Sequence, residues 1–245
     1  MSQVNYLYSL SLRLRASLIT LSTSCQLIWL STINKKATAK DFDKILSRWS
    51  NNLIALLKAK VILNNPHNLK LEKGKRYIIM CNHTSFYDIP LSYAAFPKSS
   101  VRMLAKKELS KIPVFGKAMK AASFPFIDRQ DRRQAIRDLN FAKKLMEEGI
   151  VLWIAPEGTR STDGQLNTFK KGAFITAIQA KATLIPLAIT GAFELYDKKT
   201  KKITLNQKVT LSIGTPIDAT TYKKNEKDQL VSDAHQAMKA LLSTS

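Results

Sequence analysis

Residues 77–88 read Tyr-Ile-Ile-Met-Cys-Asn-His-Thr-Ser-Phe-Tyr-Asp, an apolar run that gives way abruptly to polar side chains. A short run that is apolar throughout is typical of a strand covered on both faces, as in parallel sheets. In α/β proteins, the loops after the carboxyl ends of such strands carry the site residues. The quoted residues therefore predict a central strand at 77–81 and a functional loop directly after it.

The same pattern continues beyond this strand. From about residue 75, short apolar runs alternate with longer helix-periodic stretches, which predicts an α/β fold with a mixed, largely parallel sheet flanked by helices. The clearest helix is 131–146, which Gly149 ends, and a closing helix is expected at 227–242. The other expected strands are 101–105, 124–127, 150–155 and 184–189, with an alternating edge strand or hairpin at 203–213.

His83 and Asp88 form the sharpest chemical pattern in the chain. Two residues five positions apart do not share a helix face, but Pro90 fits only within the first turn of a helix. The helix must therefore begin close to Asp88, with His83 in the preceding turn, where the two side chains can meet. A carboxylate that orients an imidazole leaves the other ring nitrogen as a general base for acyl transfer.

Three other interpretations of this loop stay open. Asp88 could simply cap the helix, with His83 as an ordinary turn residue. Ser85 or Cys81 could instead act as a covalent nucleophile beside His83. Neither nucleophile lies in a Gly-x-Ser-x-Gly elbow or a cysteine-hydrolase signature, so both are less favoured than the His-Asp pair.

A second polar loop, Pro-Glu-Gly-Thr-Arg-Ser at 156–161, follows the expected strand 150–155. Gly158 allows a tight turn that exposes backbone N–H groups, and Arg160 offers a planar fork suited to phosphate. Basic residues also follow other expected strands, at Lys106 and at Arg129. Together they predict an anion site, although an ordinary polar turn, or pairing of the arginines after residue 128 with Asp128 and Asp131, would explain each part separately.

The first 65 residues form a separate predicted unit, followed by an α/β domain at 66–245. Residues 16–34 carry no charge, yet hydroxyl side chains interrupt them, so a membrane-spanning helix is not favoured. Residues 39–63 predict a basic amphipathic helix. The pair is expected to lie in an anionic leaflet, with Trp29 and Trp49 at the interface. Packing of the second helix on the domain core is the alternative.

The charge and cysteine content limit the partners and the compartment. The 39 basic and 18 acidic residues give a net charge of +21, which predicts polyanionic partners. Nucleic acid is disfavoured because no binding module or basic-aromatic face is visible. With only two cysteines, a reducing, cytosol-facing location is the simpler prediction. The three histidines lack neighbours at ligand spacing, so no metal is expected.

These motifs together resemble the 1-acylglycerol-3-phosphate acyltransferase family of glycerolipid synthesis. Four blocks and two linking stretches carry the resemblance, in order, over about residues 75–190. The blocks are 82–88, 126–129, 156–161 and 185–189, and the linking stretches are 105–116 and 169–173.

The resemblance implies transfer of a fatty acyl group from acyl-CoA or acyl carrier protein, as co-substrate, to the sn-2 hydroxyl of 1-acylglycerol-3-phosphate, with no cofactor. His83 would be the general base and Asp88 its partner. The substrate-binding residues would be Lys106, Arg129, Glu157, Gly158, Thr159 and Arg160. The enzyme would work at the cytoplasmic face of a membrane, the inner membrane in a bacterium. The alternatives are another acceptor (glycerol-3-phosphate, a lysophospholipid or lyso-ornithine lipid) or a non-catalytic basic membrane adaptor.

Overall fold

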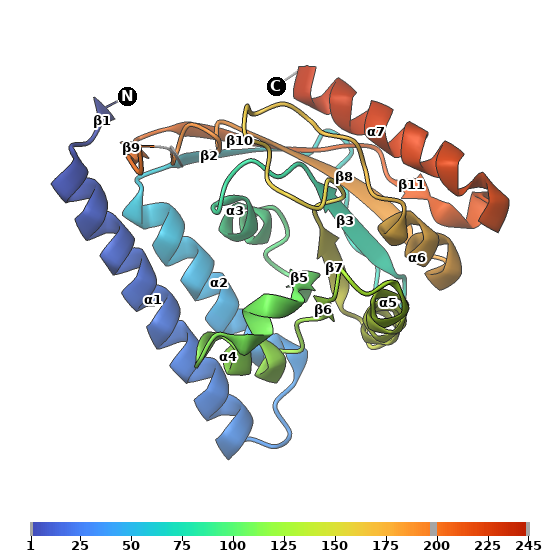
Figure 1. Cartoon of the computed structure of the whole chain (residues 1–245), viewed down its shortest axis with the longest axis horizontal. Coiled ribbons are helices and arrows are strands. Elements are labelled where there is room, and N and C mark those ends of the chain that lie inside the picture. Colours follow the sequence, from blue (N-terminus) through green and yellow to red (C-terminus); the bar gives the residue numbers. More distant parts are fainter. Residues whose placement is uncertain (1, 197–199, 244–245) are drawn as a thin grey trace.

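The computed structural model describes residues 2–196 and 200–243. Among them, a seven-stranded sheet carries helices on both faces (Figure 1). Its strands run in the order β2-β10-β8-β3-β7-β4, with β11 paired to β8. β4, β7, β3 and β8 are mutually parallel, and β10 and β11 run antiparallel to β8. The bounds are β2 Lys60–Asn64, β3 Tyr77–Cys81, β4 Val101–Met103, β7 Val151–Ile154, β8 Thr183–Thr190, β10 Lys208–Ile213 and β11 Ile217–Asp218. The predicted mixed, largely parallel sheet is therefore confirmed.

Two short pairs complete the strands of the described chain. β5 (Ala105–Lys106) pairs in parallel with β6 (Phe126–Ile127), and β1 (Ser2–Gln3) pairs with β9 (Thr204–Leu205). The single strand predicted at 101–105 is thus wrong in extent. The backbone pairs with β7 up to Met103 and then pairs with β6 from Ala105. A local pattern of apolar residues does not reveal this change of partner.

The helices form one layer on each face of the sheet. Side chains alternate between the faces of a strand, so Ile79 and Trp153 pack against the helices on one face of the sheet, while Ile78 and Leu152 pack against the helices on the other face. All five residues of β3 are buried for this reason, as the apolar run predicted. The first layer holds α1 Tyr6–Ile33, α2 Ala39–Leu56, α3 Asp88–Ala95 and α4 Phe115–Ala121, and the second holds α5 Arg132–Glu147, α6 Gly172–Ala180 and α7 Lys227–Ser243.

Helix α5 begins and ends where the sequence predicts. Asp131 is its N-cap, and its side chain accepts a hydrogen bond from the N–H of Gln134 (3.0 Å). Gly149 adopts a positive φ of 91° just beyond the C-terminus, a conformation that costs glycine little. The three connecting 3-10 turns are η1 Lys107–Lys111, η2 Ala219–Thr221 and η3 Lys224–Glu226.

The predicted helix at 39–63 is too long. Helix α2 ends at Leu56, Lys58 takes a left-handed conformation (φ 51°), and residues 60–64 form strand β2 beside β10. The backbone of these residues gains a hydrogen-bonding partner in β10, which outweighs the helical periodicity of the local sequence. A strand of the sheet therefore lies within the predicted unit 1–65, and the division at residue 65 stays a prediction.

Helix α1 is exposed along most of its length. It is the one helix of the described chain that is long and apolar enough, by length and composition, to cross a membrane, and only 17% of its most apolar window is buried. Its hydroxyl side chains bond back to the helix, as Thr20 does to the carbonyl of Ala16 (2.9 Å). The large apolar side chains exposed along it are Leu7, Leu10, Leu14, Leu18, Leu21, Trp29 and Ile33.

Helix α2 is fastened to the sheet by a buried ion pair. Arg102 on β4 is fully buried, and its Nη1 lies 2.6 Å from Oδ1 of Asp43 on α2. Arg102 Nε also donates to the carbonyl of Ala122 (2.5 Å), and the hydroxyl of Ser100 donates to Asp43 Oδ2 (2.5 Å). A buried charge is stable only with such partners, so this network fixes the position of α2.

Candidate active site

The end of β3 is held to β8 by a buried side chain. Asn82 donates from Nδ2 to the carbonyl of Ile189 (2.9 Å) and accepts from the N–H of the same residue (2.8 Å). These two bonds continue the pairing of β3 with β8 just beyond the end of β3, where the backbone hydrogen bonds between the two strands stop. The loop that begins at His83 therefore leaves the sheet from a fixed position.

His83 and Asp88 meet in this loop as the sequence predicts. Helix α3 begins at Asp88, Pro90 lies in its first turn, and Nδ1 of His83 lies 2.8 Å from Oδ2 of Asp88. Asp88 is fully buried, and the same oxygen accepts the backbone N–H groups of Thr84 (2.7 Å) and Ser85 (2.8 Å). His83 remains 19% exposed, and within the described chain its Nε2 has no hydrogen-bond partner. The pair thus presents one free ring nitrogen to a substrate.

The two alternative nucleophiles are poorly placed. Cys81 is completely buried, and burial raises the pKa of its thiol well above the ordinary value, so the reactive thiolate is disfavoured. Ser85 is 3% exposed, and its hydroxyl accepts the N–H of Tyr87 (3.3 Å). The contact of His83 with Asp88, rather than with either nucleophile, favours a general base that acts directly on substrate.

Glu157 joins the two polar loops. Its Oε1 accepts the backbone N–H of His83 (2.8 Å), and its Oε2 accepts the backbone and side-chain N–H groups of Asn167 (both 2.9 Å). A further bond runs from the N–H of Ser161 to the carbonyl of His83 (2.7 Å). Glu157 is 4% exposed. The sequence placed it among the substrate-binding residues, whereas both of its carboxylate oxygens hold protein groups.

Arg160 lies flat on an exposed ring from the first loop. Its guanidinium carbon is 3.6 Å from the centroid of Phe86, which is 57% exposed and in turn packs edge-on against Tyr196. Partial burial lowers the pKa of Arg160 below its ordinary value, although it stays far above neutrality. A stacked guanidinium keeps its N–H donors in the plane of the fork, free for an anion.

The other two predicted cations, Arg129 and Lys106, have different partners. Arg129 follows β6 and donates from Nη1 to the carbonyl of Gly158, so the structure brings it to the second loop. Lys106 on β5 is registered with Ile127 and forms an exposed ion pair with Glu108 (3.5 Å). Thr159, between Gly158 and Arg160, is exposed.

The alternative in which the arginines pair with Asp128 and Asp131 is wrong. Asp128 bonds to Lys107 instead (2.8 Å), which lowers the pKa of this carboxyl group to about 2, and Asp131 caps α5. Arg129 is thereby left available to an anion.

Two buried side chains behind the pair escaped the sequence analysis. Trp153 on β7 packs edge-on against the His83 ring (centroids 6.0 Å apart, 82°). Its Nε1 donates to the hydroxyl of Ser92 (2.8 Å), which donates to the carbonyl of Asp88 (2.7 Å). A tryptophan in a fully buried strand needs a hydrogen-bond acceptor for its indole N–H. This requirement was the sequence signal that could have indicated a buried polar partner for Trp153.

Comparisons with known proteins identify the family of the chain. The family model described as Acyltransferase matches residues 60–190, which include both polar loops and the strands before them. The chain is 32% identical over 200 residues to the 1-acyl-sn-glycerol-3-phosphate acyltransferase of Haemophilus influenzae, an alignment that covers 79% of each chain. It is 30% identical to the human beta enzyme of the same name, covering 69% of this chain and 61% of the human one.

A solved structure extends the similarity to the N-terminal helices. The crystal structure of the 1-acyl-sn-glycerophosphate (LPA) acyltransferase from Thermotoga maritima superposes with a TM-score of 0.74 at 25% identity, over 96% of both chains. The match therefore includes α1 and α2 as well as the sheet. On the strength of the family model, the sequence relatives and this fold, the chain belongs to the 1-acyl-sn-glycerol-3-phosphate acyltransferase family of glycerolipid acyltransferases.

Proposed function

We propose that this enzyme transfers a fatty acyl group from a thioester donor to the sn-2 hydroxyl of 1-acylglycerol-3-phosphate, which gives phosphatidic acid. The observation that carries the proposal is the 2.8 Å contact between His83 Nδ1 and Asp88 Oδ2, with Nε2 left unpaired by the described residues. The relatives named as acyltransferases for this acceptor support it.

The reaction proceeds by direct attack. Asp88 accepts the Nδ1 proton of neutral His83 and leaves Nε2 as the base. Nε2 removes the proton of the acceptor hydroxyl as its oxygen attacks the thioester carbonyl. The tetrahedral intermediate then collapses, the C–S bond breaks, and the proton on His83 passes to the leaving thiolate. General-base assistance of this kind supplies about a hundredfold to ten-thousandfold in rate.

The acceptor phosphate is held by cations that are already anchored. Arg160 is stacked on Phe86, and Arg129 is bonded to the carbonyl of Gly158, so each fork loses little freedom when phosphate binds. Lys106 adds a third charge from the adjoining β5. Gly158 and Thr159 line the turn between the two arginines.

For Glu157 we propose a positioning role in place of direct contact with the substrate. A carboxylate beside the phosphate would be repelled, and both oxygens of Glu157 already hold backbone groups. Its contribution is to hold the loop of His83 against the loop of Arg160. The general base His83 and the phosphate-binding Arg160 are thereby held in a fixed relative position.

The donor is acyl-CoA or acyl carrier protein, and no resident cofactor is required. A thioester is an activated acyl group, so a base and accurate positioning are chemically sufficient. Both donors are polyanions, which a net charge of +21 attracts.

The enzyme is proposed to work at the cytoplasmic face of a membrane. The exposed apolar side chains of α1 and the basic side chains of α2 fit an anionic leaflet, and both substrates carry long hydrocarbon chains.

A thiol-release assay tests the activity. The detergent-solubilised enzyme is given oleoyl-CoA with and without 1-acylglycerol-3-phosphate, and His83→Ala is compared with the wild type. Acceptor-dependent release should fall by about a thousandfold in His83→Ala. The matched control is His67→Ala, because His67 is an exposed histidine bonded to Thr215 and should keep full activity.

Other outcomes would revise the proposal. Equal release by wild type and His83→Ala would exclude His83 as the base. If the wild type releases thiol only from acyl carrier protein, or only with glycerol-3-phosphate or another lysolipid, the mechanism stands with a different substrate. Vesicle binding without turnover on any of these would support the adaptor alternative.

A further inference from the structure

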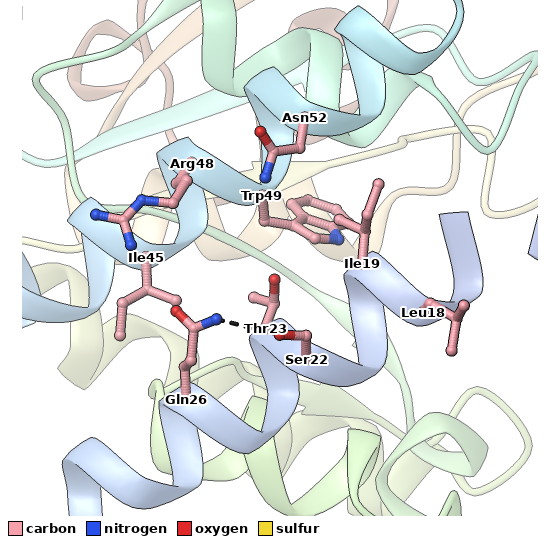
Figure 2. A pocket seen from close by; sticks show the side chains of 9 residues that line it. All are labelled: Leu18, Ile19, Ser22, Thr23, Gln26, Ile45, Arg48, Trp49 and Asn52. Atoms are coloured by element: carbon pink, nitrogen blue, oxygen red, sulfur yellow. Dashed lines mark hydrogen bonds between the residues drawn. The ribbon is translucent and has the colours of Figure 1, made fainter. Parts of the chain in front are cut away.

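A groove between α1 and α2 has no part in the proposed reaction. It encloses about 300 Å³, and none of its lining residues belongs to the loops of the active site. Figure 2 shows side chains of both helices facing one another across it, with Ile45 opposite Gln26 and Trp49 opposite Thr23. The lining residues are Leu18, Ile19, Ser22, Thr23, Gln26, Ile45, Arg48, Trp49 and Asn52.

The lining is amphipathic and carries one net positive charge. Ser22, Thr23, Gln26, Arg48 and Asn52 supply hydrogen-bonding groups, and no carboxylate is among the lining residues. Within residues 2–196 and 200–243, the side chains of Arg48 and Asn52 form no hydrogen bond or ion pair. Arg102, by contrast, is buried and has four partner atoms. Gln26 Nε2 donates to the hydroxyl of Ser22 (3.3 Å), so among the described residues of the groove Arg48 and Asn52 are the side chains available to an outside ligand.

The position of the groove identifies the kind of ligand. Leu18 lines the groove, and it also belongs to the row of apolar side chains that α1 exposes. It is 64% exposed, like Trp29 further along the helix. If this row enters a leaflet, the groove opens beside it, at the depth of the lipid phosphates. A ligand there would meet hydrocarbon on one side and Arg48 on the other.

We propose that the groove binds one anionic phospholipid of the leaflet as an accessory ligand, distinct from the acyl acceptor. Its phosphodiester contacts the guanidinium of Arg48 and the amide of Asn52, and a hydrocarbon chain follows Ile19 and Leu18 outward. A volume of about 300 Å³ lies at the lower end of ligand pockets, which suits a headgroup whose chains remain in the bilayer. The inference rests on the proposed membrane location and not on the proposed chemistry.

Trp49 connects the groove with the catalytic helix. It lines the groove, its Nε1 donates to Thr20 on α1 (3.1 Å), and its ring packs edge-on against Tyr93 on α3 (centroids 6.2 Å apart). The next residue, Ser50, donates to the carbonyl of Pro90 (2.6 Å). Bound lipid would therefore stabilise α1 against α2 at the point where α2 contacts the helix that begins with Asp88.

Vesicle partitioning of the full-length enzyme tests the site. Binding is measured to phosphatidylcholine vesicles with and without phosphatidylglycerol, and the ratio of the two affinities is the readout. Arg48→Gln is compared with Lys44→Gln, which removes the same charge from an exposed position on α2. Ser22→Phe fills the groove without a change of charge.

The proposal predicts unequal losses. Lys44→Gln should lower the phosphatidylglycerol-dependent ratio by about fivefold or less, because it removes only surface attraction. Arg48→Gln should lower it about tenfold further, because charge-assisted hydrogen bonds to the phosphate are also lost. Ser22→Phe should also lower it about tenfold, while binding to pure phosphatidylcholine stays unchanged. Equal losses in the two charge variants, or a normal ratio in Ser22→Phe, would overturn the proposal.

Fluorescence separates a lipid from a free phosphate. In a Trp29→Phe background, brominated phosphatidylglycerol should quench Trp49, while Trp153 is 3% exposed and serves as the unquenched reference. Soluble glycerol phosphate should leave the quenching intact. If it abolishes quenching, the groove is a phosphate site and the lipid assignment is wrong. Neither readout requires turnover, so failure of the proposed activity would leave this test interpretable.

Discussion

The environment of the polar side chains differs between two regions of the molecule: the two loops after β3 and β7, and the pair of helices α1 and α2. In the loops, Asn82, Asp88 and Glu157 are at most 4% exposed, and each side chain accepts hydrogen bonds from backbone N–H groups. In the helical pair, Arg48 and Asn52 are exposed beside a row of exposed apolar side chains. The loops pair their buried polar groups within the protein, whereas the helical pair leaves Arg48 and Asn52 open to the surroundings.

This difference fits the two tasks. Proton transfer requires a base held within hydrogen-bonding distance of its partner, and the bonds within the loops hold His83 beside Asp88 in the described structure. Membrane attachment requires a surface whose apolar area is covered only after binding. The buried ion pair of Arg102 with Asp43 joins α2 to strand β4 of the sheet that carries the loops. The following predictions test each region and this link.

Substitution of Asp88 should have the largest effect on the loops. Asp88→Asn keeps an oxygen that accepts the N–H groups of Thr84 and Ser85 but removes the charge that orients His83, so kcat should fall by about a hundredfold or more. Asp88→Ala should lose the same activity and, in addition, about 2 kcal/mol of unfolding free energy, because two buried N–H groups lose their acceptor. Thiol-release kinetics and denaturant unfolding measure both. Normal kcat in Asp88→Asn would show that the carboxylate is only structural.

Substitution of Asp43 should break the link between α2 and the sheet. Asp43→Ala leaves Arg102 buried without its carboxylate, and the unfolding free energy should fall by about 3–5 kcal/mol. The double variant Asp43→Ala/Arg102→Leu should recover much of this loss, because no buried charge remains. A loss below about 1 kcal/mol for Asp43→Ala, as for a surface pair, would mean that apolar packing alone holds α2 to the sheet.

Substitution of Phe86 should weaken acceptor binding without affecting the base. Phe86→Leu removes the ring under Arg160, and the KM for 1-acylglycerol-3-phosphate should rise about fivefold with kcat unchanged. Phe86→Tyr keeps a ring and should behave as the wild type. In an Arg160→Ala background, Phe86→Leu should have no further effect. An equal further increase in that background would show that the ring acts on the substrate independently of Arg160.

The smallest effect is expected at the pair formed by the half-buried Asp128 and the exposed Lys107. The bond to Lys107, together with bonds from the N–H groups of Gln130 and Asp131, lowers the pKa of Asp128 from 3.8 to about 2. The contribution to stability is therefore present above pH 3.8 and is lost as the pH falls through 2. Asp128→Asn should therefore be slightly less stable than the wild type at neutral pH, and the difference should shrink below pH 4. Thermal unfolding at a series of pH values measures it. A difference that is constant with pH would assign it to packing.

The sequence predicted most of the elements near the active site because local chemistry determines them. The buried strand at 77–81 and the helix that Asp131 caps follow from apolar runs and capping residues. The meeting of His83 and Asp88 follows from Pro90, which sets the start of α3 within a few residues of the pair.

The sequence failed where a distant segment determined the outcome. The helix predicted at 39–63 ends early because β10, far along the chain, offers the backbone of 60–64 a partner. Glu157 was placed in the substrate pocket by the family resemblance, and no local pattern indicated that its carboxylate accepts a backbone N–H 74 residues away. Arg102, a charge inside an apolar strand, was a signal of a buried partner, but no local pattern identified Asp43.

By itself, then, the sequence determined the α/β class, the His-Asp pair and the basic strand ends, because each depends on residues only a few positions apart. The tertiary structure alone decided that Glu157 joins the two loops, that Phe86 supports Arg160, and that α1 and α2 enclose a groove. These features arise from contacts between segments that lie far apart in the chain. Their energy depends on packing and burial, which local spacing does not encode.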